Sequence, residues 1–241
     1  MTHLQISSRP RRRAVAMALI GLVASAASPA NATGAKASTV IELFTSQGCS
    51  SCPPANENFR ALSDRPGVLA LSFSVTYWDY IGWKDTFASP AYTARQRAYV
   101  RPLGNATPFT PQIVVNGHRD VVGNRRGELD ELIADSRFGA DAPTVKLGSR
   151  AVSVGVGTAP GGAADVWLVR YDPATVEVSV RRGENGGRTL PHKNVVHGLE
   201  RIGRWNGSPA SFSFSAARGG LKTAVLVQAP QGGPILGAAT N

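Results

Sequence analysis

Two cysteines, the only ones in this sequence of 241 residues, lie in the segment LFTSQGCSSCPPA at residues 43–55. Cys49 and Cys52 form a C-x-x-C motif, and thiols at this spacing support three kinds of chemistry. They form a local disulfide that stabilises the fold, hold a metal ion as thiolates, or act as a redox pair in which one thiol attacks and the other resolves. The surrounding residues help to distinguish these alternatives.

A purely structural disulfide is the weakest interpretation, because closing so short a loop stabilises a fold by only about 2 kcal/mol on the chain-entropy model. A zinc site needs four ligands, and no second C-x-x-C motif or nearby histidine supplies the other two. Copper(I) is a soft ion that two thiolates alone can hold. A soft-metal binding module therefore stays open as the alternative to redox chemistry.

The residues on either side of the motif favour the redox interpretation. Residues 39–44 (TVIELF) predict a buried strand, and apolar residues recur at helical spacing over 53–62. Cys49 then lies where a helix begins, and the helix dipole and free N–H groups there stabilise a thiolate. Cys52 is placed to resolve a mixed disulfide formed by Cys49.

The rest of the first half continues an alternation of strands and helices. We expect a strand over 67–76, a helix starting at Ser89-Pro90, a hairpin over 112–123 and a last helix over 126–136. One face of the second helix carries small apolar residues: Ala91, Ala94 and Ala98.

Thr110 and Pro111 stand directly before the predicted hairpin. The segment TPQIVVNGHRDVVGNRRGELDELI resembles the part of thioredoxins and glutaredoxins in which a cis-proline loop leads into a hairpin and the last helix. The resemblance implies that Pro111 lies against the cysteines and that the backbone before it pairs with an incoming peptide or thiol. It therefore assigns substrate binding to Thr110 and Pro111.

Four aromatic residues lie close together in the segment VTYWDYIGWKDTF at residues 75–87. One interpretation is a packing plug over a sheet edge. The other is a binding wall beside the thiols, in which the aromatic residues, Trp78 among them, supply contact area and Asp79 or Lys84 a polar handle. On the second interpretation Trp78 and Asp79 bind substrate, and Asp79 is a hypothetical general acid/base for a thiol.

Other polar residues carry weaker expectations. Glu42 is one place away from the buried-acid position of thioredoxins, so strand alternation turns it to the opposite side from Leu43. His192 and His197 are five positions apart, which puts them on opposite faces of a regular strand and argues against a metal pair. Residues 184–187 have the composition of a hairpin turn.

After about residue 140 the sequence changes to short alternating strands separated by glycine and proline, which predicts a β-sandwich or a small barrel.

The chain as a whole is similar to the exported bacterial domain of unknown function 1223 family. The resemblance is carried by the segments IELFTSQGCSSCPPAN, VTYWDYIGWKD, TARQRAY, TPQIVVNG and RGENGGRTL…NVVHGLERIGRW. That resemblance covers nearly all of the mature chain. It implies a thioredoxin-like domain with an appended β-domain, and it implies no reaction.

Residues 1–32 combine an arginine-rich start, a short apolar run and an A-x-A site, which predicts a cleaved export signal and a periplasmic or secreted protein. The run is too short to span a bilayer, so we expect no stable membrane insertion after cleavage. Removing residues 1–32, which contain four arginines and no acidic residue, lowers the formal charge from +10 to +6. The remaining basic residues are scattered, so we expect no nucleic-acid partner.

The expected fold class is an α/β thioredoxin-like domain over 38–140 followed by an all-β, sandwich-like domain over 143–241. The expected function is that of an exported thiol–disulfide oxidoreductase, with Cys49 as nucleophile and Cys52 as resolving thiol. Its partner would be a protein or small molecule bearing a thiol or disulfide, and no cofactor is implied. A soft-metal module and a non-catalytic scaffold stay as alternatives, and the oligomeric state is left open.

Overall fold

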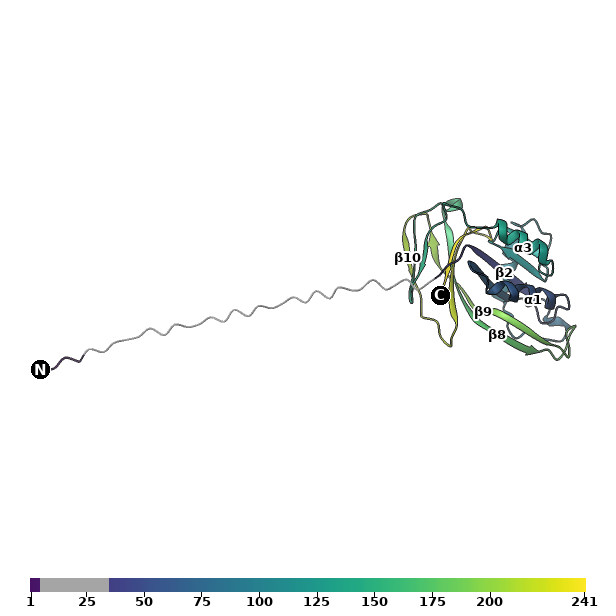
Figure 1. The fold of residues 1–241 in the computed structure, drawn as a ribbon, viewed down its shortest axis with the longest axis horizontal. Helices are drawn as coiled ribbons and strands as arrows, with labels where there is room; N and C mark the ends of the chain where they lie inside the picture. The colour runs from purple at the N-terminus through teal and green to yellow at the C-terminus, as the bar shows by residue number, and fades with distance from the viewer. Residues whose placement is uncertain (5–34) are drawn as a thin grey trace. The chain divides into compact units, whose positions relative to one another are not determined.

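The structure is a computed structural model that describes residues 1–4 and 35–241 of the chain. β-strands dominate this part (Figure 1). The chain divides into two units, Met1–Ala30 and Asn31–Asn241, and the second holds every described helix and strand. Apart from residues 1–4, the predicted export signal lies outside the described residues. No helix in the described part is long and apolar enough to cross a membrane.

Nine strands form one mixed sheet in the order β1-β12-β11-β8-β9-β3-β2-β4-β5. Their bounds are β1 (Ala35–Lys36), β2 (Thr39–Thr45), β3 (Val68–Ser74), β4 (Gln112–Val115), β5 (Arg119–Val122), β8 (Ala164–Ser179), β9 (Thr189–Trp205), β11 (Lys222–Gln228) and β12 (Ile235–Thr240). A second sheet has the order β10-β7-β6. Its strands are β6 (Val145–Leu147), β7 (Ala151–Val154) and β10 (Ala210–Ser213).

The described helices are few and follow the predicted positions. They are α1 (Cys52–Ser63), α2 (Pro90–Val100) and α3 (Arg126–Asp135), with short 3₁₀ turns η1 (Asp79–Ile81) and η2 (Pro160–Gly162). Helix α2 begins where a cap was expected, because the Ser89 hydroxyl accepts a hydrogen bond from the Ala91 N–H at 3.3 Å and Pro90 occupies the first turn.

Strand β2 is buried along its whole length and separates two apolar clusters. Val40 and Phe44 pack with residues of α2 and β3, whereas Ile41 and Leu43 pack with residues of α1 and α3. Because alternate residues of a strand point to opposite faces, α2 covers one face of the sheet and α1 and α3 the other. A third cluster, which includes Trp205, fills the space between the small sheet and β8, β11 and β12.

The fold class expected from the sequence is wrong. The protein is mostly β, and strands from both halves of the chain belong to one sheet rather than to a thioredoxin α/β core with a separate β-domain. Strand β9 pairs in parallel with β3 at Val195 and Ser72, and Figure 1 shows the long β8–β9 hairpin running beside α1. The hairpin therefore covers the edge of β3, where the Asn194 amide also donates to the Ala70 carbonyl oxygen at 2.9 Å. The boundaries 38–140 and 143–241 stay a prediction.

Candidate functional site

The cysteine loop, residues 46–51, connects the end of β2 to the start of α1, and it carries a disulfide between Cys49 and Cys52. The two Cα atoms are 5.4 Å apart. The Cys52 N–H donates to the Cys49 carbonyl oxygen at 3.2 Å, which closes the turn between the two residues. Both residues are buried, with exposed fractions of 1 % for Cys49 and 0 % for Cys52.

The start of α1 offers fewer N–H donors to a Cys49 thiolate than the sequence analysis expected. Cys52 is the first helical residue and its N–H is already bonded to Cys49, and the next two residues, Pro53 and Pro54, have no N–H. The Ser51 hydroxyl lies 3.3 Å from the Cys49 sulfur. A thiolate at Cys49 can therefore accept a hydrogen bond from the Ser51 hydroxyl. The helix dipole stabilises its charge as well.

A segment from the second half of the chain covers the cysteine loop. We call residues 180–188, between β8 and β9, the hairpin tip. Asn185 is fully buried there, and its amide donates hydrogen bonds to the carbonyl oxygens of Gln47 at 3.0 Å and Cys49 at 2.9 Å. The Glu184 carboxylate accepts a hydrogen bond from the Ser50 N–H at 2.9 Å. The hairpin tip thus accounts for part of the burial of Cys49.

The geometry of the hairpin tip presents Asn185 to the cysteine loop. Gly183 and Gly187 have φ values of +75° and +81°, a conformation that favours glycine. The Gly187 N–H donates to the Val180 carbonyl, and the Arg188 guanidinium donates to the Asn185 side-chain oxygen at 2.8 Å. The turn expected at 184–187 is confirmed. The contact of Asn185 and Glu184 with the cysteine loop was missed, because turn composition says nothing about what a turn packs against.

Trp78 connects the cysteine loop to the Thr110–Pro111 loop. Its indole N–H donates to the Thr110 hydroxyl at 2.7 Å, and its Cβ lies in tight contact with Gly48, where an added Cβ would be 3.3 Å away. The Thr110–Pro111 peptide bond is cis. The next residue, Gln112, pairs with Phe44 near the end of β2. The structure therefore brings three of the predicted segments together.

Asp79 lies in the aromatic segment but makes no hydrogen bond to either cysteine among the described residues. Its carboxylate accepts from the Asp85 N–H at 3.1 Å. Asp85, which was not singled out from the sequence, is the acid of this segment that is bonded to the cysteine loop: it is buried and accepts from the Gln47 N–H at 2.8 Å. Burial raises the pKa of the Asp85 carboxyl above its ordinary value, although the N–H donors of Gln47 and Phe87 oppose this.

The side chain of Gln47 attaches part of the aromatic segment to the cysteine loop. Gln47 is fully buried, and its side-chain oxygen accepts hydrogen bonds from the Trp83 indole at 2.9 Å and the Thr86 N–H at 3.2 Å. These bonds hold the far end of the aromatic segment against the cysteine loop. The substrate-binding role of Trp78 and Asp79 stays a prediction.

The expectation that His192 and His197 lie on opposite faces is wrong, because both rings make edge contacts with Phe87, at centroid distances of 5.5 and 6.0 Å. The register of β9 with β8 shifts at Asn194, whose φ is +50°, and again at His197, so regular strand alternation does not hold between the two histidines. His192 is 2 % exposed, and burial lowers its pKa to about 4. In the described residues no group of three His, Cys, Asp or Glu side chains is placed to hold a metal ion.

Comparisons with known proteins place this geometry in context. A family model described as "Protein of unknown function (DUF1223)" matches residues 40–228. A crystal structure of a structural-genomics protein from Agrobacterium tumefaciens is 32 % identical, with a TM-score of 0.68 over 85 % of this chain and 93 % of that one. HBP35 of Porphyromonas gingivalis is 12 % identical, with a TM-score of 0.57 over 86 % of this chain and 75 % of that one, and so is similar in fold alone. No curated protein matches the chain.

Proposed function

Because this chain belongs to the DUF1223 family of proteins of unknown function, we propose its activity from its own site: Cys49 and Cys52 exchange with thiols or disulfides of an external substrate. In the reductive direction the Cys49 thiolate attacks a substrate disulfide, forms a mixed disulfide and releases one substrate thiolate. The Cys52 thiolate then attacks the Cys49 sulfur, which releases the second substrate thiolate and forms the Cys49–Cys52 disulfide. Two electrons pass to the substrate, and the reverse sequence oxidises a substrate dithiol.

The observation that carries this proposal is the position of the disulfide between neighbouring residues at the start of α1. It closes a loop between residues only three positions apart, and such a loop contributes only about 2 kcal/mol to stability on the chain-entropy model. A pair placed there is better suited to switching between dithiol and disulfide. We propose a relation to thioredoxins for the site alone, in the C-x-x-C pair before a helix and the Thr110–Pro111 loop beside it.

Access to the pair depends on the hairpin tip. A reactive cysteine is normally reachable from solvent, whereas Cys49 is 1 % exposed and its loop is bonded to Asn185 and Glu184. The proposed exchange therefore requires the hairpin tip to move away from the cysteine loop. Oxidised protein with the tip closed is protected from indiscriminate thiols. We propose that this selects partners able to displace the tip, in the periplasm or outside the cell.

Trapping of the mixed disulfide tests the roles of the two cysteines. A Cys52→Ser variant has no resolving thiol, so incubation with oxidised glutathione should leave glutathione covalently bound to Cys49, detected by mass spectrometry. The matched variant Cys49→Ser should trap far less. Labelling under unfolding conditions first establishes that the remaining thiol of each variant is intact. Equal trapping of glutathione by the two folded variants, or trapping by neither, would then contradict the assignment.

The reduction potential tests the activity itself. We expect the metal-free protein, equilibrated in glutathione buffers, to give a reversible potential between about −120 and −270 mV, the range of known exchange catalysts. A pair that stays oxidised below about −300 mV would be structural. Titration of the reduced protein with copper(I) in parallel measures the soft-metal alternative. Among the described residues, no third His, Cys, Asp or Glu side chain joins the two cysteines as a possible metal ligand.

A further inference from the structure

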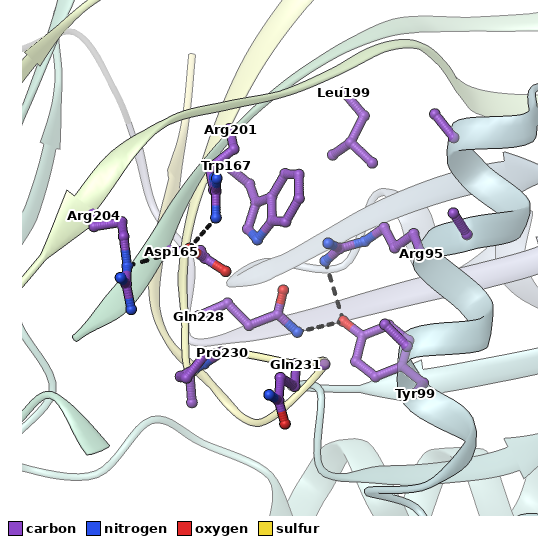
Figure 2. Close-up of a pocket in the computed structure, with 15 residues that line it drawn as sticks. Arg95, Tyr99, Asp165, Trp167, Leu199, Arg201, Arg204, Gln228, Pro230 and Gln231 are labelled. Carbon is purple, nitrogen blue, oxygen red and sulfur yellow. Dashed lines mark hydrogen bonds and ion pairs between the residues drawn. The ribbon is translucent and has the colours of Figure 1, made fainter. Parts of the chain in front are cut away.

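A cleft of about 620 Å³ opens between α2 and the sheet strands β8, β9 and β11 (Figure 2). None of the residues that line it belongs to the cysteine loop or to the hairpin tip. Its volume is in the range of small-molecule binding sites, which is about 300–1,000 Å³. The cleft therefore has the size of a ligand site and is separate from the proposed redox site.

The outer part of the cleft stays open because the exposed side chains that α2 turns to it there are methyl groups. Ala91, Ala94 and Ala98 line it and are exposed, whereas Arg95 and Tyr99 are buried and reach it only at its inner end. Trp167 on β8 and Leu199 on β9 form the opposite wall. A flat or branched apolar body fits between these surfaces, since both walls are apolar.

A rigid hydrogen-bonded group forms the inner end of the cleft. The Arg95 guanidinium donates to the buried Glu42 carboxylate, with Nε–Oε1 at 2.5 Å, and lies 5.6 Å from the centre of the Trp167 ring. The Tyr99 hydroxyl also donates to Glu42 and accepts from the Gln228 amide at 2.9 Å. Because Glu42 neutralises Arg95, this end is polar without a net charge.

Gln228 has an acceptor without a partner in this cleft. The residue is 2 % exposed, and its amide nitrogen donates to Tyr99 and to the Gly233 carbonyl at 2.8 Å. Its side-chain oxygen has no hydrogen-bond partner among residues 1–4 and 35–241. Figure 2 shows this oxygen pointing into the space between Trp167 and Arg95. The oxygen lies on the wall of the open cleft, so it can accept a hydrogen bond from an N–H or O–H group of a ligand bound there.

The mouth of the cleft carries an excess of positive charge. Asp165 is within 3.2 Å of the Arg201 guanidinium and 4.0 Å of the Arg204 guanidinium, so one carboxylate faces two cations. Both arginines are more than half exposed, and Figure 2 shows them on either side of Asp165. An anionic group at this rim would be attracted by the uncompensated charge.

We infer that this cleft binds a small organic anion. The apolar body of the ligand packs between the alanine face of α2 and Trp167, its N–H or O–H donates to the Gln228 oxygen, and its carboxylate or sulfonate pairs with Arg201 and Arg204.

Two fluorescent probes that differ by one charged group test this inference. 1-Anilinonaphthalene-8-sulfonate has an aromatic body, an N–H donor and a sulfonate, and N-phenyl-1-naphthylamine is its neutral twin. Titration of the protein, with its cysteines oxidised, should show one saturable site for the sulfonate probe. Ala94→Phe, which fills the cleft, should weaken both probes by about tenfold or more. Ala61→Phe, on the exposed side of α1, is the matched control and should change neither.

The double variant R201Q/R204Q tests the anionic class of ligand. It should weaken the sulfonate probe by about tenfold and change the neutral probe by less than about twofold, because only the first has a charge to pair. Circular dichroism and thermal unfolding establish that each variant is folded. The inference is overturned if the sulfonate probe shows no saturable binding, if folded Ala94→Phe binds like the unaltered protein, or if R201Q/R204Q affects both probes equally.

Discussion

Asn185 donates a hydrogen bond to the Cys49 carbonyl oxygen at 2.9 Å, from a position 136 residues further along the chain. The same amide group also donates to the Gln47 carbonyl at 3.0 Å. These two bonds attach the hairpin tip to the loop that carries the proposed nucleophile. Reactivity of the cysteine pair is therefore tied to the stability of a contact between the two halves of the chain.

We expect Asn185→Ala to increase the rate at which dithiothreitol reduces the Cys49–Cys52 disulfide. The variant loses both hydrogen bonds from the tip to the cysteine loop, roughly 1 kcal/mol each, which corresponds to a rate increase of about tenfold or more if opening of the tip limits reduction. Thiol trapping over time at fixed pH measures the rate. Asn206→Ala, at an exposed position directly after β9, is the control. An unchanged rate in folded Asn185→Ala would show that the tip does not limit access.

Acid should open the hairpin tip through Glu184. Hydrogen bonds from Ser50 lower the pKa of the Glu184 carboxyl below its ordinary value of 4.5. The bond therefore stabilises the closed tip at pH values above 4.5 and is lost as the pH falls through the lowered pKa. We expect the reduction rate of the protein, divided by that of Glu184→Gln, to be below one at pH 6 and to approach one under acid conditions. The ratio removes the reductant's own pH dependence, and a ratio independent of pH would exclude this role.

His192 should make the protein less stable as the pH falls from about 6.5 to about 4. Burial lowers its folded pKa from 6.5 to about 4, so the unfolded chain binds a proton that the folded protein does not. The loss across this window is about 3 kcal/mol, and below it the loss stops growing. Urea unfolding at a series of pH values measures it. His192→Gln should flatten this part of the profile, whereas His197→Gln, exposed on the same strand, should leave it in place.

Glu42 and Arg95 should depend on each other for stability. Both are buried, so Glu42→Gln or Arg95→Met alone leaves one charge without its partner and should lower the free energy of unfolding by about 3–5 kcal/mol. The double variant removes both charges and should lose clearly less than the sum of the single variants. A double-mutant cycle by urea unfolding measures the coupling. Additive losses would contradict it.

Local patterns in the sequence were enough to locate the first-half elements and the cysteine pair between a strand and a helix. Helix α2 starts at its Ser-Pro cap, and Glu42 faces away from Leu43, because caps and strand alternation involve residues close in sequence. The fold class failed because strand periodicity does not say which strand pairs with which. The prediction for His192 and His197 failed because the register of β9 with β8 shifts at Asn194 and again at His197, so regular alternation does not hold between the two histidines.

Tertiary contacts alone decided how the site is enclosed and where the second site lies. The composition of residues 184–187 predicts a turn, but only the pairing of β9 with β3 carries that turn to Cys49. The alanines of α2 share a helix face in the sequence, yet only the position of Trp167 on β8 makes that face one wall of a cleft. The physical reason is that both features depend on packing between segments far apart in the sequence. The burial of Cys49 and the cleft beside α2 each need a partner from another strand or turn, which no local pattern encodes.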